Sequence, residues 1–439
     1  MYRTHLLASA AQSFFALVAA LFAPLIFVAQ DPATPTPPQD PVLAKARAVI
    51  NELCSPDLHG RGYVNGGDSL AADLLGAKFK ALGLEPMKGS YFEPFTFNVN
   101  SFPDPIYAVI DGMALEPGVD FIVGPSSGKA SGSFGIAHVT PADLSGESAS
   151  RTFGVITGKA VHFKVPATKN ADSLALFAKM ERELMYYAPV IKRSSGKLTW
   201  SVAQEALPFP LLEVLPEAIS DSAETIDLRL RNTMIKKHGA RNVWGWVKGK
   251  KPGKGTVIIS AHYDHLGRMG EAIFPGANDN ASGVAMLLSL AERFAKEPPD
   301  HNVFFIAFAG EEAGLQGSTW CVADRPIEWS TVKLMVNLDI MGTGDDGIMV
   351  VNATVQEEEF ALLTQINTDK PRLADIKSRG PACNSDHCPF VQKGIPAIFI
   401  YTLGGIAAYH DVNDRPETLP LTDFVDIHHT LSDFLHALK

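Results

Sequence analysis

The sequence predicts an α/β protein whose central sheet is covered by helices on both faces. Segments of near-continuous apolar residues, typical of strands buried on both faces, alternate with amphipathic helical segments over the second half of the chain. Charged side chains gather directly after several of these strands. Because open α/β sheets bind ligands at the carboxyl ends of their strands, a functional site is expected at the same positions.

Two helices open the expected fold, at residues 42–53 and 69–82. Apolar residues recur there at helical spacing, and the second helix stops at Gly83, a residue type that commonly follows a helix. An irregular stretch is expected at 85–95. From 102 to 222, short β-like segments are separated by Gly, Pro and Ser, with one helix around 171–187. We therefore expect a β-rich insertion there.

After residue 222, strands and helices alternate. The clearest helix begins at Ser282, whose side chain is expected to cap it, and its apolar positions form a single stripe that faces the core. The expected strands are 256–261, 303–309, 332–339, 347–351 and 397–402, and the expected helices are 282–296, 356–366 and 421–438.

The composition is that of a globular protein without a nucleic-acid partner. The chain has 439 residues, 46% hydrophobic and 20% charged, which is enough for one large core or for a core with a second domain. Its formal net charge is −10. Nucleic-acid binders carry basic patches and not a diffuse acidic excess, so that class of partner is not expected.

The N-terminus predicts export. Arg3 precedes a strongly apolar segment at residues 6–29, and a basic start before an apolar stretch is typical of a secretory signal peptide. We expect residues 1–29 to be removed near Ala29, which gives a periplasmic or extracellular protein. The apolar segment is also long enough to cross about 30 Å of hydrocarbon, so an uncleaved membrane anchor is the alternative. Residues 30–41 are Pro-rich and are expected to form a linker.

Four cysteines allow three pairings in an oxidising compartment: Cys54, Cys321, Cys383 and Cys388. Cys383 and Cys388 are expected to pair because they are close in sequence. The alternative is four reduced, partly buried thiols. No pair has the spacing of a structural zinc site, so no metal is assigned to them.

The candidate site residues all lie at or after the ends of expected strands, or in the loops between them. Two His, two Asp and two Glu offer the nitrogen and oxygen ligands that suit divalent zinc. One ion needs only three of them, so six favour two ions about 3.5–4 Å apart that share a carboxylate. These residues are His262, Asp279, Glu311, Glu312, Asp339 and His410.

Each of these positions also has an ordinary interpretation. Taken singly, these positions are explained equally well as a polar loop, a solvated pair of glutamates, a helix cap and a surface histidine. Their occurrence together in strand order favours the metal site. Asp264 is expected outside the ligand set, where its carboxylate accepts the second N–H of His262 and fixes the tautomer of that ring.

Six motifs resemble the bacterial double-zinc aminopeptidase family, whose relatives include glutamate carboxypeptidase II, glutaminyl cyclases and the transferrin receptor. The motifs are HYDHLG, GANDNASG, AGEEAGLQGS, NLDIMG, NSDHCPF and YHDVNDRPE. The resemblance covers about residues 42–100 and 241–438. It implies a three-layer α/β/α fold with a mixed, mostly parallel central sheet, split into 42–101 and 223–439. Through GKAVHFK and LPFPLLEV, residues 102–222 resemble an inserted protease-associated domain.

The resemblance also implies roles, carried over position by position. His262 and Asp339 match the ligands of one zinc ion, Glu312 and His410 those of the other, and Asp279 the bridge between them. Glu311 matches the general base, and the peptide bond before Asn280 matches one that is cis in the family. Tyr409 matches a tyrosine that stabilises the oxyanion in some members; a buried structural tyrosine is the alternative. Asp386 and His387 match a motif expected to support the structure.

The function implied by the resemblance is that of an exported aminopeptidase with two Zn2+ per chain, acting on the N-termini of peptides or proteins. Glu311 would take a proton from the water shared by the two ions as that water attacks the carbonyl. Alternatives on the same scaffold are a dipeptidase, a carboxypeptidase or a glutaminyl cyclase. A non-catalytic, receptor-like binding protein is the alternative from another class.

Overall fold

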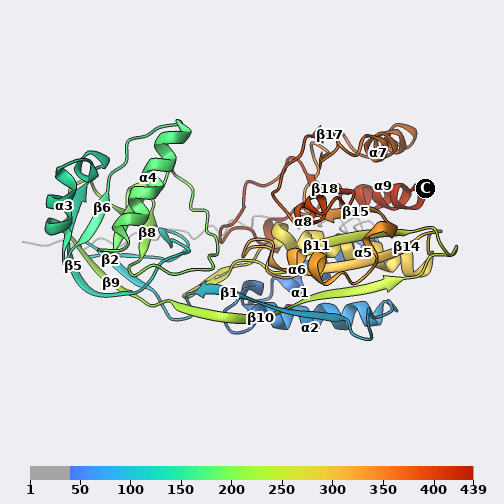
Figure 1. Cartoon of the computed structure of the whole chain (residues 1–439), viewed down its shortest axis with the longest axis horizontal. Coiled ribbons are helices and arrows are strands. Elements are labelled where there is room, and N and C mark those ends of the chain that lie inside the picture. The colour runs from blue at the N-terminus through green and yellow to red at the C-terminus, as the bar shows by residue number, and fades with distance from the viewer. Residues whose placement is uncertain (1–39, 439) are drawn as a thin grey trace, which may run out of the picture. The chain divides into compact units, whose positions relative to one another are not determined.

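The computed structural model describes residues 40–438. The expected signal peptide or anchor (1–29) and nearly all of the linker (30–41) lie outside the described residues. Within 40–438, no helix combines the length and apolar character that crossing a membrane requires. Two eight-stranded sheets organise this part of the chain (Figure 1).

The central sheet is mixed and mostly parallel, as predicted. Its inner strands pair in parallel, whereas the first two strands are antiparallel to their neighbours and β16 is antiparallel to β18. In Figure 1 the two long strands of one edge run side by side. The strand order is β1 (Phe92–Ser101), β10 (Thr233–Val247), β14 (Asn302–Phe308), β11 (Thr256–His262), β15 (Val332–Leu338), β18 (Ala397–Thr402), β16 (Ile348–Val351) and β17 (Ile376–Arg379).

Helices cover both faces of this sheet, which confirms the three-layer prediction. Successive side chains of a strand point to opposite faces. On β11, Val257 and Ile259 accordingly join one apolar core and Ile258 joins the other, and all three are fully buried. The first core is covered by α1 (Pro41–Leu53), α2 (Gly67–Ala81), α5 (Gly283–Lys296), α7 (Glu357–Asp369) and α9 (Phe424–Ala437), and the second by α6 (Gln316–Asp324) and α8 (His387–Gln392).

Two expectations about local structure were wrong. Residues 92–95 belong to β1 and not to an irregular stretch. The strand contains Pro94, which is tolerated because β1 is the edge strand of the sheet, where a missing N–H costs no ladder bond. The Ser282 side chain does not cap α5; it donates to the Asn278 carbonyl, and Asn280 Oδ1 accepts the N–H of Gly283 at 3.0 Å.

The second sheet forms the β-rich part of the chain, together with α3 (Ser148–Ile156) and α4 (Ala171–Leu184). It includes β9, which lies beyond residue 222, because β9 pairs with β2 and β5. Its likeness to a protease-associated domain stays a prediction. The strand order is β3 (Met113–Leu115), β2 (Tyr107–Ile110), β9 (Thr225–Leu230), β5 (Ala130–Val139), β6 (Ala160–Phe163), β7 (Val190–Arg193), β8 (Leu211–Val214) and β4 (Phe121–Val123).

A short hairpin, β12 (Gly267–Met269) and β13 (Ala272–Phe274), follows β11.

The predicted cysteine pair is confirmed, because Cys383 and Cys388 form a disulfide. Cys54 and Cys321 are free thiols.

Candidate metal centre

Three neighbouring strands bring the first residues of the site together. β11 lies between β14 and β15 and runs parallel to both, so the carboxyl ends of all three strands meet at one edge of the sheet. His262 ends β11, Glu311 and Glu312 follow β14, and Asp339 follows β15. Residues far apart in the sequence therefore become neighbours by strand pairing alone.

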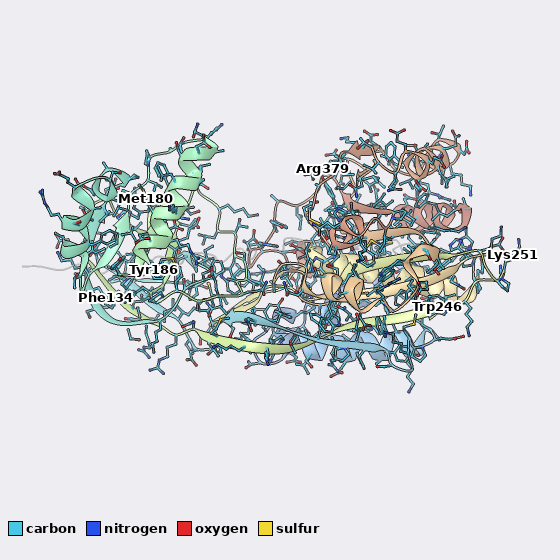
Figure 2. The ribbon with its side chains drawn as sticks, in the orientation of Figure 1. Phe134, Met180, Tyr186, Trp246, Lys251 and Arg379 are labelled. Carbon is cyan, nitrogen blue, oxygen red and sulfur yellow. A yellow bond between two sulfur atoms is a disulfide. The ribbon has the colours of Figure 1, made fainter. Side chains whose placement is uncertain are left out.

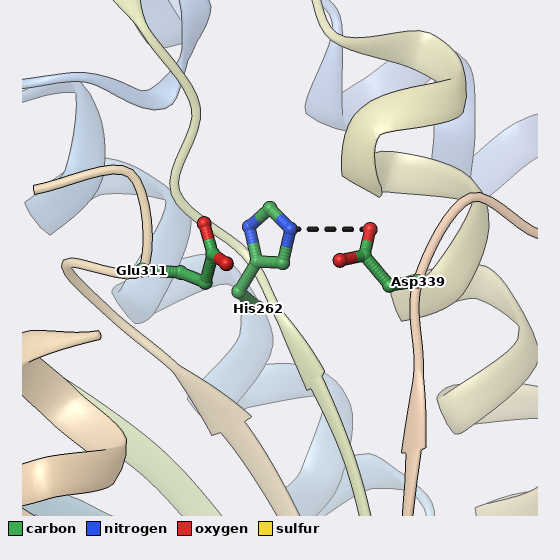
Figure 3. A group of neighbouring side chains, drawn as sticks. All are labelled: His262, Glu311 and Asp339. Atoms are coloured by element: carbon green, nitrogen blue, oxygen red, sulfur yellow. Dashed lines mark hydrogen bonds and ion pairs between the residues drawn. The ribbon is translucent and has the colours of Figure 1, made fainter. Parts of the chain in front are cut away.

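The first half of the site is formed around His262. Its Nε2 lies 3.3 Å from Asp339 Oδ1 and 3.3 Å from Asp279 Oδ1. Figure 3 shows the imidazole between the carboxylates of Glu311 and Asp339. One ligand atom from each of these three residues lies within 4.8 Å of the others. The His262 side chain is only 1% exposed, so the group lies in the protein interior.

The second half of the site is formed around His410. Its Nε2 lies 3.0 Å from Asp279 Oδ2 and 3.3 Å from Glu312 Oε2. Asp279 thus directs one oxygen toward His262 and the other toward His410. The structure brings all five sequence-predicted ligands together, with Asp279 in the middle.

The loop that carries Asp279 is fixed by its own polar groups. The N–H groups of Asn278 and Asp279 donate to the two oxygens of Asp414 at 2.8 and 2.9 Å. Asn280 Nδ2 donates to the Leu338 carbonyl at 3.0 Å, next to Asp339. The peptide bond between Asp279 and Asn280 is cis, as the resemblance implied. The Asn280 bond thus ties the loop that carries Asp279 to the end of β15.

Asp264 has a different role from the one predicted. Its carboxylate is 3.9 Å from His262 Nδ1, whereas its backbone carbonyl accepts that N–H at 3.1 Å. The carboxylate instead accepts the backbone N–H groups of Glu311 at 3.1 Å and Glu312 at 3.3 Å, and the Tyr63 hydroxyl at 2.7 Å. The sequence spacing placed Asp264 correctly beside His262, but only the packing of the loop after β14 shows that its carboxylate holds the two glutamates.

His265 lies at the site although no role was predicted for it. The fully buried ring places Nδ1 2.8 Å from Glu312 Oε1, while the other Glu312 oxygen faces His410. The sequence signal was its position in HYDHLG, directly after Asp264. Spacing alone did not show which glutamate oxygen it would meet.

Negative charge dominates the centre. Burial and the nearby carboxylates of Asp386, Glu312 and Asp339 raise the pKa of Glu311 well above its usual range. Burial alone would lower the pKa of His410, but Glu312 and Asp279 raise it to about 11. Carboxylates crowded in this way are stabilised by a bound cation as they are by a proton. The donor set of imidazole nitrogens and carboxylate oxygens therefore fits divalent zinc.

Asp339 is supported by a buried chain of side-chain hydrogen bonds. Ser385 Oγ donates to Asp339 Oδ2 at 2.9 Å and accepts from Asn337 Nδ2 at 2.8 Å. The disulfide between Cys383 and Cys388 encloses Ser385. The NSDHCPF motif thus supports one of the predicted ligands.

Two further polar side chains differ in their relation to the centre. Tyr409 stacks on His410, with ring centroids 4.0 Å apart, and is 44% exposed, so it is not a buried structural residue. Arg379 lies on the edge strand β17 (Figure 2). Its Nη1 donates to the Tyr401 hydroxyl at 3.4 Å. Only Tyr409 therefore lies against the predicted ligands.

Arg61 positions the loops of the site, a role that no sequence pattern predicted. The guanidinium is fully buried and donates to the carbonyls of Tyr263 (2.8 Å), Leu53 (3.1 Å), Pro275 (2.7 Å) and Gly276 (2.8 Å). It therefore joins the segment after His262 to the segment before Asp279.

Replacing Arg61 with Met is expected to lower the free energy of unfolding by at least about 3 kcal/mol, because several buried carbonyls lose their donors at about 1–3 kcal/mol each. Equilibrium unfolding in guanidinium chloride measures this change in the free energy of unfolding. Arg47, which also donates to two carbonyls but from a half-buried helix position, is the matched control, and Arg47→Met should cost less. Equal unfolding midpoints for Arg61→Met and the unaltered chain would contradict this role.

Comparison with known proteins agrees with this geometry. Residues 242–435 match the model of peptidase family M28. The match contains every residue of the centre and confirms the resemblance indicated by the six motifs.

Aminopeptidase YwaD of Bacillus subtilis is 26% identical over 210 residues, covering 46% of this chain and 45% of that protein. A probable zinc metalloprotease of Pyricularia oryzae is 40% identical over 111 residues, covering 24% of this chain and 22% of that protein. Each of these alignments spans less than half of the relative's length.

Solved structures show the same fold over nearly the whole described chain. An aminopeptidase from Aneurinibacillus sp. strain AM-1 superposes with a TM-score of 0.62 at 20% identity, covering 90% of this chain and 93% of that one. A zinc aminopeptidase from Bacillus subtilis superposes with a TM-score of 0.66 at 19% identity, covering 90% and 94%. Over 90% of its length, the chain therefore shares a known fold.

Proposed function

We propose that the protein is an exported zinc-dependent aminopeptidase that binds two zinc ions and removes residues from the N-termini of peptides or proteins. One observation carries the proposal most directly. The two oxygens of Asp279 face two separate groups, His262 with Asp339 and Glu312 with His410. A carboxylate between two sets of ligands is the arrangement that two neighbouring ions require.

The chain's own residues account for the remaining chemistry. When bound, zinc supplies a Lewis acid that polarises a carbonyl and lowers the pKa of a shared water. Glu311 shares its cluster with His262 and Asp339, a position that suits a base that takes a proton and later returns it to the departing amine. Tyr409 is exposed enough to donate to an oxyanion while its ring rests on His410.

Two features support export. The basic and apolar start of the sequence is typical of a signal peptide, with cleavage after residues 1–29 or retention as an anchor. The Cys383–Cys388 disulfide, part of which is solvent-exposed, suits an oxidising compartment.

The test is hydrolysis of three substrate classes with and without a zinc chelator. Aminoacyl amides should be hydrolysed and N-blocked peptides should not, because an aminopeptidase needs a free amino group. The chelator should abolish turnover, and added zinc should restore it. Preference for dipeptides would favour the dipeptidase alternative, and cyclisation of N-terminal glutamine without hydrolysis the cyclase. Two bound zinc ions without turnover of any substrate would overturn the proposed activity.

A further inference from the structure

His410 is held by residues of the β-rich insertion expected at 102–222. The other predicted ligands are held by the central sheet and its loops. Its Nδ1 lies 3.0 Å from the Trp200 carbonyl oxygen, and the Trp200 N–H donates to the His410 carbonyl at 2.9 Å. Because a carbonyl only accepts hydrogen bonds, Nδ1 must carry the proton. In the neutral ring that a metal ion requires, Nε2 would then offer its lone pair on the side of Asp279 and Glu312.

The backbone of His410 also needs this support. Its φ is +53°, in the left-handed region that residues with a side chain rarely adopt. The paired bonds to Trp200 hold that conformation. Lys197 adds a second tie, since its Nζ lies 3.2 Å from Asp411 Oδ2 and donates to the Ala407 carbonyl at 2.8 Å. The chain on both sides of His410 is therefore bound to the segment 197–200.

Trp200 is itself firmly anchored. Its indole is 4% exposed, donates to the Val123 carbonyl at 2.8 Å, and packs 4.6 Å from the Phe274 ring. Phe274 ends β13 and, together with Leu266 and Met269, joins the apolar core of the insertion. The insertion thus shares a core with the segment that links His262 to the Asp279 loop.

We propose that Trp200 is a positioning residue of the metal centre, through which the insertion sets the tautomer and direction of His410 and so the affinity of one of two zinc ions. The inference rests on the proposed function, because it requires a two-ion centre. The His262 half receives its support from the Asp264 carbonyl and from Ser385, both outside the insertion. The effect of Trp200 should therefore be confined to the ion bound by Glu312 and His410.

The test is titration of the metal-free protein with Zn2+ against a competing chelator, which resolves two binding constants. Trp200→Phe keeps an aromatic ring but loses the bond to Val123, and should lower the affinity for one zinc ion about 10-fold. Trp200→Ala should weaken the same ion by about 10–100-fold. Lys197→Met, a substitution at a surface side chain that leaves the core intact, should act in the same direction. In a His410→Ala background, Trp200→Phe should leave the affinity for the remaining zinc ion unchanged.

Matched controls separate positioning from general destabilisation. Trp244 is also buried and donates its indole N–H to a carbonyl, that of Ser90 at 2.9 Å, but lies in β10. Lys164 contacts Asp221 within the insertion as Lys197 contacts Asp411. Trp244→Phe and Lys164→Met should bind both ions normally. Unchanged binding in the Trp200 and Lys197 variants, or equal weakening of both ions, would overturn the inference. An unaltered chain that never binds a second ion would instead overturn the proposed function.

Discussion

Glu311→Gln is expected to lower turnover by about 10²–10⁴-fold, the contribution of a general base, while zinc content stays near two per chain. Gln keeps the size of the side chain but cannot take a proton. In the proposed centre Glu311 is not a ligand, so its loss removes proton transfer without removing a metal contact.

Turnover and metal content should be measured on the same preparation of this variant. Glu93 is the matched control, since it is also buried, its pKa is raised to about 7 by burial, and it lies on β1. Glu93→Gln should retain turnover and both ions. Residual turnover of Glu311→Gln within ten-fold of the unaltered chain would rule out Glu311 as the base.

Asp279→Asn is expected to release both zinc ions, which no other single substitution of a ligand should do. Each Asp279 oxygen faces a different histidine, so an amide would present an N–H₂ group to one of them. The loss of affinity should exceed the roughly 10–100-fold cost of removing a partner outside the ligand set. Equilibrium dialysis followed by metal analysis measures the number of ions retained.

His410→Ala provides the contrast for Asp279→Asn. It removes a ligand from one half only and should retain one ion, held by His262, Asp279 and Asp339. If Asp279→Asn kept one ion with the affinity of the unaltered chain, Asp279 would not be the bridge. Loss of both ions in His410→Ala would show that the two halves do not bind independently.

The loop after β14 shows how tertiary packing changed one prediction. Spacing along an extended strand put Asp264 beside His262, and that proximity is correct. Its carboxylate is nevertheless used to hold the backbone of Glu311 and Glu312. A period of two residues identifies which side chains share a face, but not which backbone groups another loop brings to them.

The sequence determined the ligand types, their order and their positions at strand ends, because buried strands and amphipathic helices have distinct periodicities and because strand ends converge in such sheets. It also predicted the disulfide between Cys383 and Cys388. Only the tertiary structure revealed the roles of Arg61, His265 and Trp200. Their partners are Tyr263, Glu312 and His410, and two of these pairs join segments that are about two hundred residues apart. No local pattern encodes such contacts, since they depend on how the insertion and the first helices pack against the sheet.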